Sequence, residues 1–277
     1  MQELGLRQRQ VDRRQSLVLL GSFFCTLPSL ALAQAGGLAG MGVVLLHGKG
    51  GSPGGPLSAL AGALQGNGAL VSMPAMPWQG SGGRPSGYLE SYDQAMARIG
   101  GAAQQLRSRG AKRIVVGGLS FGANAAIGYA ARHGGTLAAV VALAPGHVPE
   151  LAGFRQAVAE GVSRAQQLVA AGQGNTPTML PDANQGATFQ VSARPSAYLS
   201  YFDPNGPAVM PRNAARMPSV PFLWVVGTGD GMYQRGEGYA FARAPRHPKS
   251  KYLVVSAGHI DTPNVAREQV AAWLRTL

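Results

Sequence analysis

The chain has 277 residues, a formal net charge of +12 at pH 7 and a single cysteine, Cys25. Cys25 lies in a segment that we expect to be removed, so a mature protein would hold no disulfide, cysteine nucleophile or cysteine metal site. The basic residues are scattered without a run of five, which argues against nucleic acid as a partner and indicates at most a loose electrostatic association with anionic envelope surfaces.

Residues 1–33 are predicted to form a signal peptide. Four arginines precede a largely apolar run over 16–32, and Ala31-Leu32-Ala33 is an A-x-A cleavage signal that would leave Gln34 as the mature N-terminus. The run is interrupted by polar residues and a proline, so we expect no membrane segment after its removal. The predicted location is therefore periplasmic or secreted. Arg13-Arg14 partly matches a twin-arginine signal, but Ser16 departs from that pattern, which leaves the export route open.

From residue 42 onward, short apolar runs alternate with helical patterns. Strands are predicted at 42–46, 69–73, 114–116, 138–143, 220–226 and 251–255, and helices at 56–64, 92–109, 123–133, 151–171 and 265–277. Gly110 follows the second helix where a C-terminal capping glycine belongs. Strands that are apolar throughout indicate a mostly parallel sheet of about six strands with helices on both faces. We predict one α/β domain over 34–277.

The alternation breaks after the strand at 138–143. Residues 172–218 are rich in Gly, Pro, Asn and Ser and show no clear period. A long segment of this kind within a compact domain usually has a function. Because it follows a strand of the sheet, we predict that 147–218 forms a cap over a site.

The segment around Ser120 is typical of a nucleophile. Gly118-Leu119-Ser120-Phe121-Gly122 matches G-x-S-x-G, with a β-branched run before it and an alanine-rich helix after it. A serine on so sharp a turn needs small neighbours at 118 and 122, because larger side chains would collide with the backbone. The turn would also direct the Phe121 N–H at an anion that forms beside Ser120. A plain glycine-rich turn is the alternative.

Two further strand ends carry the partners that a serine nucleophile requires. Asp230 follows the strand at 220–226, and His259 follows the strand at 251–255. His259 could accept the serine proton, and Asp230 could hold the imidazole and offset its charge. Asp261 is the rival carboxylate, but Asp261-Thr-Pro263 favours a helix-capping role. Ligands of parallel sheets gather at the carboxyl ends of strands, where all these residues lie.

Ser120, Asp230 and His259 occur in the chain order of α/β-hydrolases, and the sequence over 42–277, apart from the insert, resembles that family. The resemblance implies a three-layer α/β-hydrolase fold and hydrolysis of an ester, thioester or amide. It also implies that the backbone N–H of Lys49, which follows His47-Gly48, joins Phe121 in an oxyanion hole. We expect a serine carboxylesterase acting on a small or polymeric ester. A serine peptidase or amidase, and a catalytically silent envelope binding protein, are the alternatives.

Four other residues are candidates for substrate contact: His47, Trp78, His147 and Tyr201. His47 could instead orient the oxyanion loop, and His147 could serve equally well as a loop hydrogen-bonding residue. Trp78 and Tyr201 belong to two aromatic groups that could line a pocket or close the cap onto the body. The sequence holds no H-E-x-x-H motif, carboxylate cluster or complete phosphate-loop motif, so no metal or cofactor is expected.

Overall fold

The computed structural model describes residues 37–277, so the predicted signal peptide and Cys25 lie outside the described residues. A six-stranded sheet in the order β10-β9-β6-β5-β1-β2 forms its centre, and every neighbouring pair is parallel. The strands are β1 (Met41–Leu46), β2 (Leu70–Ser72), β5 (Arg113–Leu119), β6 (Ala139–Leu143), β9 (Phe222–Gly227) and β10 (Lys251–Val255). This confirms the predicted fold class.

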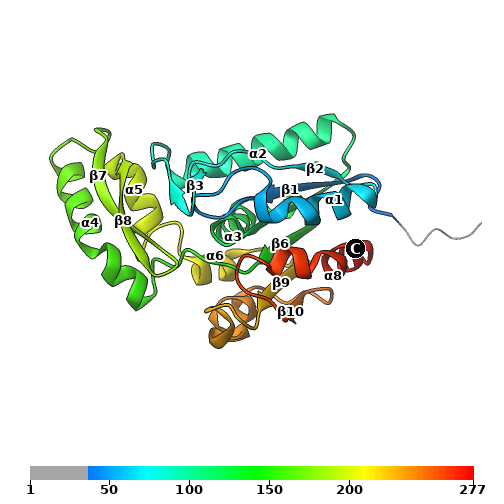
Figure 1. The fold of residues 1–277 in the computed structure, drawn as a ribbon. Coiled ribbons are helices and arrows are strands. Elements are labelled where there is room, and N and C mark those ends of the chain that lie inside the picture. The colour runs from blue at the N-terminus through cyan, green and yellow to red at the C-terminus, as the bar shows by residue number, and fades with distance from the viewer. Residues whose placement is uncertain (1–36) are drawn as a thin grey trace, which may run out of the picture. The chain divides into compact units, whose positions relative to one another are not determined.

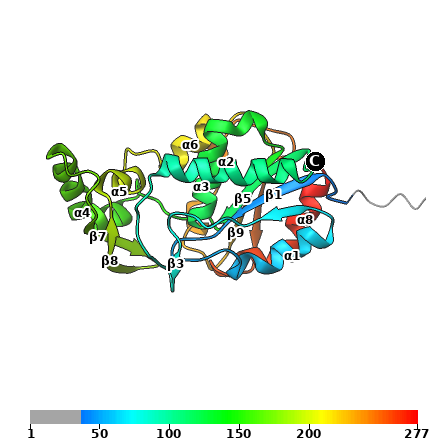
Figure 2. The ribbon, with the colours of Figure 1, turned by 90° about the horizontal axis from the view of Figure 1, so that it is seen from above.

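Helices cover both faces of this sheet (Figures 1 and 2). One face packs against α2 (Tyr92–Ser108), α3 (Phe121–His133) and α6 (Met210–Arg216), and the other against α1 (Ser58–Gly66), α7 (Thr262–Val265) and α8 (Arg267–Arg275). Successive strand residues point to opposite faces, so Val44 and Leu46 join the first core while Val43 and Leu45 join the second. Both faces are buried, which explains why the strands are apolar throughout.

Local signals account for several helix boundaries. Ser91 and Gln94 form a capping box at the start of α2, and Gly110 follows its end with a φ of +101°. The helix predicted at 265–277 corresponds to α8, and the short helix α7 precedes it, separated from it at Ala266. Pro263 lies in the first turn of α7, a position where its missing N–H costs no hydrogen bond.

The insert after β6 contains the helix predicted at 151–171, and it also contains a hairpin and a short helix that the sequence analysis did not find. Its elements are α4 (Ala152–Ala170), β7 (Thr178–Asn184), β8 (Ala187–Ala193) and α5 (Pro195–Phe202), which lie together in Figure 1. β7 and β8 form an antiparallel hairpin, and its two turn residues, Gln185 and Gly186, have φ values of +49° and +79°. The alternation of apolar and polar residues that indicates a strand is not visible in β7, because Pro181 interrupts it and the buried residue Asp182 is charged. α6 falls within the predicted cap range but packs against α3.

Smaller elements complete the described part of the chain. They are the hairpin β3 (Gly80–Ser81) and β4 (Arg84–Pro85) and the 3-10 turns Gly55–Leu57, Gly134–Thr136, Tyr233–Arg235, Glu237–Tyr239 and Phe241–Arg243. Within residues 37–277, no helix has both the length and the apolar character needed to span a bilayer.

Candidate active site

Ser120 sits between β5 and α3 in a conformation that few side chains adopt. Its φ is +57° and its ψ is −117°, and α3 begins at the next residue rather than at the predicted position 123. A Cβ at position 118 would lie 2.5 Å from the carbonyl carbon of Gly122, and one at position 122 would lie 2.1 Å from the Leu46 oxygen. The structure therefore supplies the steric reason for both glycines of the motif.

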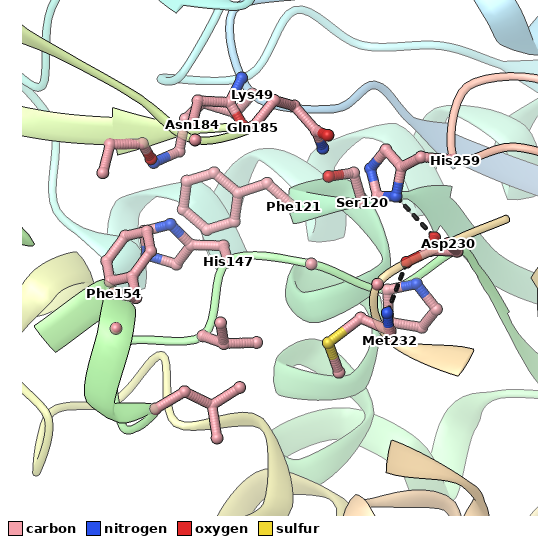
Figure 3. A pocket seen from close by; sticks show the side chains of 18 of the residues that line it. Lys49, Ser120, Phe121, His147, Phe154, Asn184, Gln185, Asp230, Met232 and His259 are labelled. Carbon is pink, nitrogen blue, oxygen red and sulfur yellow. Dashed lines mark hydrogen bonds and ion pairs between the residues drawn. The ribbon is translucent and has the colours of Figure 1, made fainter. Parts of the chain in front are cut away.

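Asp230 and His259 contact each other across the ends of β9 and β10. Asp230 Oδ2 lies 2.6 Å from His259 Nδ1, and the Met232 N–H donates to Asp230 Oδ1 at 2.7 Å (Figure 3). A carboxylate accepts at both positions, so His259 donates from Nδ1, which in the neutral ring leaves the lone pair on Nε2. Asp261 is exposed; it occupies the N-cap position of α7, but its side chain makes no capping bond, contrary to the expectation for that residue.

Ser120 and His259 face the same space. A methyl group built on Gly146 would lie 2.8 Å from Ser120 Oγ and 3.7 Å from His259 Cε1, so both groups border one small volume (Figure 3). His259 Nε2 is buried and has no hydrogen-bond partner within residues 37–277. Its lone pair is thus available to a hydroxyl that turns toward it.

Two backbone N–H groups near Ser120 are free to bind an anion. In the described part of the chain, neither the Phe121 N–H nor the Lys49 N–H donates to a protein acceptor. Phe121 is the first residue of α3, where the helix dipole adds to the attraction for negative charge. These are the two residues that the sequence analysis assigned to an oxyanion hole.

His47 holds the loop that follows β1. Its Nδ1 donates to the Gly48 carbonyl at 2.9 Å, and its Nε2 accepts from the Met76 N–H at 3.1 Å. Burial lowers the pKa of His47, which keeps the ring neutral as this pair of bonds requires. Of the two roles that the sequence left open for His47, the geometry supports orientation of the oxyanion loop over substrate contact.

His147 lies in the wall of the site with a φ of +62°. Its Nε2 donates to the Tyr201 carbonyl at 2.8 Å, and its ring stacks on Phe121 at a centroid distance of 3.8 Å. Burial, with a further contribution from the Lys49 charge, holds the pKa of His147 well below its usual value. The ring is therefore neutral, and it makes the loop hydrogen bond while also lining the cavity.

Trp78 and Tyr201 do not line the cavity. Both side chains are fully buried, and Trp78 stacks on Phe121 at 4.4 Å, while Tyr201 packs edge-on against Phe121 and at a tilt against Tyr88. Trp78 Nε1 also donates to the His47 carbonyl at 2.9 Å. The structure thus favours packing of the insert onto the body over substrate contact for these two residues.

Two cavities meet at Ser120 and His259. The larger has a volume of about 520 Å³ and extends between the insert and the loop after β9. The smaller, of about 290 Å³, is lined mainly by the glycine-rich loop after β1 and by residues 82–83. Asn184 and Gln185, at the tip of the β7–β8 hairpin, border both. A substrate could therefore extend to either side of the serine.

Several residues of the larger cavity were missed by the sequence analysis. They are Gly146, Phe154, Asn184, Gln185, Met232 and Arg235. Gly146 follows the end of β6 and could have been found by considering every strand end. Asn184-Gln185-Gly186 is a hairpin-turn sequence, but the runs on each side lacked a strand pattern. No group of three or more His, Cys, Asp or Glu side chains in residues 37–277 could hold a metal ion.

Comparison with known proteins gives a family match and several related folds. A model described as the alpha/beta hydrolase family matches residues 43–273, whereas no curated protein matches the chain. One similar structure comes from work on LipS and LipT, two metagenome-derived lipolytic enzymes; identity is 15%, the TM-score is 0.60, and 86% of this chain and 95% of that one are covered. A monoacylglycerol lipase from Paleococcus ferrophilus is 19% identical with a TM-score of 0.56, covering 85% and 94% of the two chains. A thermophilic esterase from Thermogutta terrifontis is 18% identical with a TM-score of 0.54, covering 86% and 90%.

Proposed function

The chain belongs to the alpha/beta hydrolase family, and on that premise we propose that it is a serine hydrolase that cleaves a carboxylic ester through an acyl-enzyme intermediate. The observation that carries the proposal is the convergence of three side chains at three strand ends. Asp230 is bonded to His259 at 2.6 Å, and the free Nε2 of His259 borders the same small volume as Ser120 Oγ. These are the parts that acyl transfer from an activated serine needs.

In the first half of the reaction, Ser120 Oγ attacks the ester carbonyl carbon while its proton passes to His259 Nε2. Asp230 remains ionised and stabilises the imidazolium through Nδ1–H. As the tetrahedral intermediate collapses, the carbon–oxygen bond of the ester breaks and His259 returns the proton to the leaving alcohol. A water molecule then repeats the sequence on the acyl-enzyme, which releases the carboxylic acid and restores the Ser120 hydroxyl.

The developing oxyanion requires donors that are already in place. The Lys49 and Phe121 N–H groups supply two, and within residues 37–277 neither has to break a protein hydrogen bond in order to donate to the oxyanion. One such donor contributes roughly 3–4 kcal/mol to transition-state stabilisation. Because of these two donors, the site binds the negatively charged tetrahedral intermediate more tightly than the neutral ester.

The choice of an ester over an amide rests on the solved structures that resemble this fold. The similar structures named above are described as lipolytic enzymes, a lipase and an esterase. The two cavities on either side of Ser120 also leave space for an acyl group and an alcohol group. The proposal does not extend to the identity of either group.

A fluorophosphonate probe tests the nucleophile. We expect stoichiometric labelling at Ser120 in the folded protein and none in Ser120→Ala. Absence of labelling in the wild-type protein would leave the silent binding protein as the better description. Parallel assays with p-nitrophenyl esters and aminoacyl p-nitroanilides then separate esterase from peptidase, and faster turnover of the anilides would replace the ester assignment.

The role of Asp230 is tested against a matched carboxylate. Asp230→Asn should lower kcat by about 10⁴-fold, because an amide favours the wrong tautomer of His259. Asp261→Asn changes the same group two residues beyond His259, where the carboxylate is exposed and the His259 ring is hydrogen-bonded to Asp230 instead, and should retain full activity. A larger loss in Asp261→Asn would transfer the orienting role to that residue.

We also propose that the chain is exported and that its positive charge promotes loose adsorption to anionic envelope surfaces. Both ideas rest on the sequence, through residues 1–33 and the net charge of +10 that remains once those residues are removed. N-terminal sequencing of the protein recovered from the periplasm or medium should begin at Gln34. Adsorption to anionic vesicles should weaken steeply between 50 mM and 500 mM salt if it is electrostatic.

A further inference from the structure

A buried ion pair joins the loop after β1 to the hairpin of the insert. Lys49 Nζ lies 2.5 Å from Asp182 Oδ1, and the two side chains are only 2% and 0% exposed. Lys49 Nζ also donates to the Ala183 carbonyl at 3.0 Å, and the Tyr88 hydroxyl donates to Asp182 Oδ2 at 2.9 Å. Both charges are thus paired and hydrogen-bonded, although both side chains are buried.

Stability alone gives no reason for such a pair. Removing two charges from water is costly, and apolar side chains of similar volume usually stabilise a buried position equally well or better. Burial lowers the pKa of Lys49, although the nearby Asp182 charge acts in the opposite direction. The lowered pKa reflects the same cost of removing the ammonium charge from water. A buried ion pair of this kind fixes the relative positions of its two residues. Here one of them is Lys49, whose backbone lies near Ser120.

The hairpin provides a fixed anchor for the pair. The Tyr88 N–H donates to the Ser192 carbonyl at 2.9 Å, and the Arg194 N–H donates to the Tyr88 carbonyl at 3.0 Å. Asn184 Nδ2 donates to the Gly83 carbonyl at 2.9 Å. These bonds attach both strands of the hairpin to the segment before α2 and to the β3–β4 turn, so Asp182 is held by the body of the domain.

Lys49 lies in a loop whose residues before and after it are held by hydrogen bonds, whereas in residues 37–277 its own backbone N–H is not. The Gly50 N–H donates to the Trp78 carbonyl at 2.9 Å, and a Cβ at position 50 would lie 2.1 Å from the Arg84 nitrogen. His47 is bound at both ring nitrogens. The backbone N–H of Lys49, by contrast, has no protein acceptor in the described residues, so its side chain is the anchor that remains.

We propose that Asp182 is a positioning residue for the oxyanion hole: by holding the Lys49 ammonium it sets the direction of the Lys49 backbone N–H. The inference rests on the proposed function, because it assigns a role to that N–H in the reaction. It also makes the hairpin of the insert a fixed part of the catalytic apparatus rather than a cover that opens during turnover.

Loss of the Asp182 charge would leave Lys49 as a buried, unpaired cation. Lys49 already lines the 520 Å³ cavity beside Ser120 (Figure 3), so its ammonium has space to turn into that cavity. A side chain that turns into the cavity would rotate the peptide that carries the N–H. The donor acts mainly on the oxyanion of the transition state, so its displacement should lower kcat and leave KM nearly unchanged.

The decisive variant is Asp182→Asn, with Asp203→Asn as its matched control. Asp203 is also in the insert, but within residues 37–277 its carboxylate accepts only from the Asn205 N–H and has no link to Lys49. Loss of one oxyanion donor costs about 10²–10³-fold in kcat, so we expect a fall of at least tenfold and up to this range in Asp182→Asn. KM should change by less than about threefold, and Asp203→Asn should behave as the wild type. Assays are run well below the melting temperature of each variant, with folding checked by circular dichroism.

Two outcomes would overturn the proposal. If folded Asp182→Asn loses less than tenfold in kcat, the ion pair is structural only. If the loss falls on KM, Lys49 or Asp182 contacts the substrate instead. Should Asp182→Asn fail to fold, Asp182→Glu and Tyr88→Phe replace it, because the first displaces the carboxylate by one methylene and the second removes one of its bonds. The limits on kcat and KM given for Asp182→Asn then apply to Asp182→Glu. In Tyr88→Phe, kcat should fall by a smaller factor.

Phosphonate labelling separates this proposal from the proposed function. The probe's phosphoryl oxygen uses the same donors, so labelling of Ser120 should slow in parallel with kcat in Asp182→Asn. An unlabelled wild-type protein would defeat the serine hydrolase assignment itself. A labelled wild type whose rate is unaffected by Asp182→Asn would defeat only the positioning role.

Discussion

Gly146 offers the sharpest test of where Ser120 reacts from. The residue follows β6, and its N–H donates to the Ser120 carbonyl at 3.1 Å. A methyl group at this position would lie 2.8 Å from Ser120 Oγ, 3.6 Å from Ser120 Cα and 3.7 Å from His259 Cε1. Gly146→Ala would therefore place a methyl group in the space where the hydroxyl must meet the ester and the imidazole.

The magnitude follows from the contact. An ordinary contact to a Cβ begins near 3.4 Å, so Ser120 Oγ would have to retreat by roughly 0.6 Å. A misplacement of about 1 Å can cost about 10²-fold in rate, and we therefore expect kcat to fall by about 10- to 100-fold. This range corresponds to about 1.4–2.7 kcal/mol of lost transition-state stabilisation.

The assay measures kcat, KM and the rate of phosphonate labelling for Gly146→Ala on a short-chain p-nitrophenyl ester. Gly62→Ala in α1 is the control, because a methyl group there meets no atom within 4 Å and the site is remote. Thermal unfolding separates a local effect from loss of the fold. A kcat within twofold of the wild type, with normal labelling, would refute the assignment of the reaction to this position of Ser120.

Three further predictions concern stability and packing. Gly122→Ala should lower the free energy of unfolding by 1–3 kcal/mol or more in urea titrations, because its Cβ would lie 2.1 Å from the Leu46 oxygen; an unchanged midpoint would contradict this. His147 takes up a proton near pH 6.5 when unfolded, but burial lowers its pKa in the folded state, so stability should fall as the pH drops below about 6.5. His147→Phe should reduce the loss between pH 7 and 5 by up to about 2 kcal/mol, and an unchanged slope would show that the folded ring also titrates there. Tyr201→Phe removes a buried hydroxyl that has no partner in the described residues, so it should raise stability by up to about 1 kcal/mol or leave it unchanged. A tenfold rise in KM for Tyr201→Phe would restore a substrate contact for that residue.

The sheet and the ends of its strands could be predicted from the sequence because their signals are local. Apolar runs such as 138–143 are buried on both faces and end abruptly at glycine or polar residues, and the structure confirms the six strands. In a parallel sheet these ends lie along one edge, so Ser120, Asp230 and His259 could be grouped before any distance was known. The distance of 2.6 Å then distinguishes Asp230 from Asp261 as the partner of His259.

The insert shows why other features could not be predicted. Asp182 reads as a charge that breaks a strand pattern, yet it is fully buried because Lys49 lies 133 positions earlier in the chain and reaches the same point. Trp78 and Tyr201 carry no local sign of whether an aromatic ring packs inside or faces a ligand. Local patterns determined the strands, the serine turn and the order of the three polar residues. Contacts between distant segments decided the ion pair, the aromatic packing and the cavity shapes, because the free energy of a buried charge or ring depends on neighbours that the adjacent sequence does not contain.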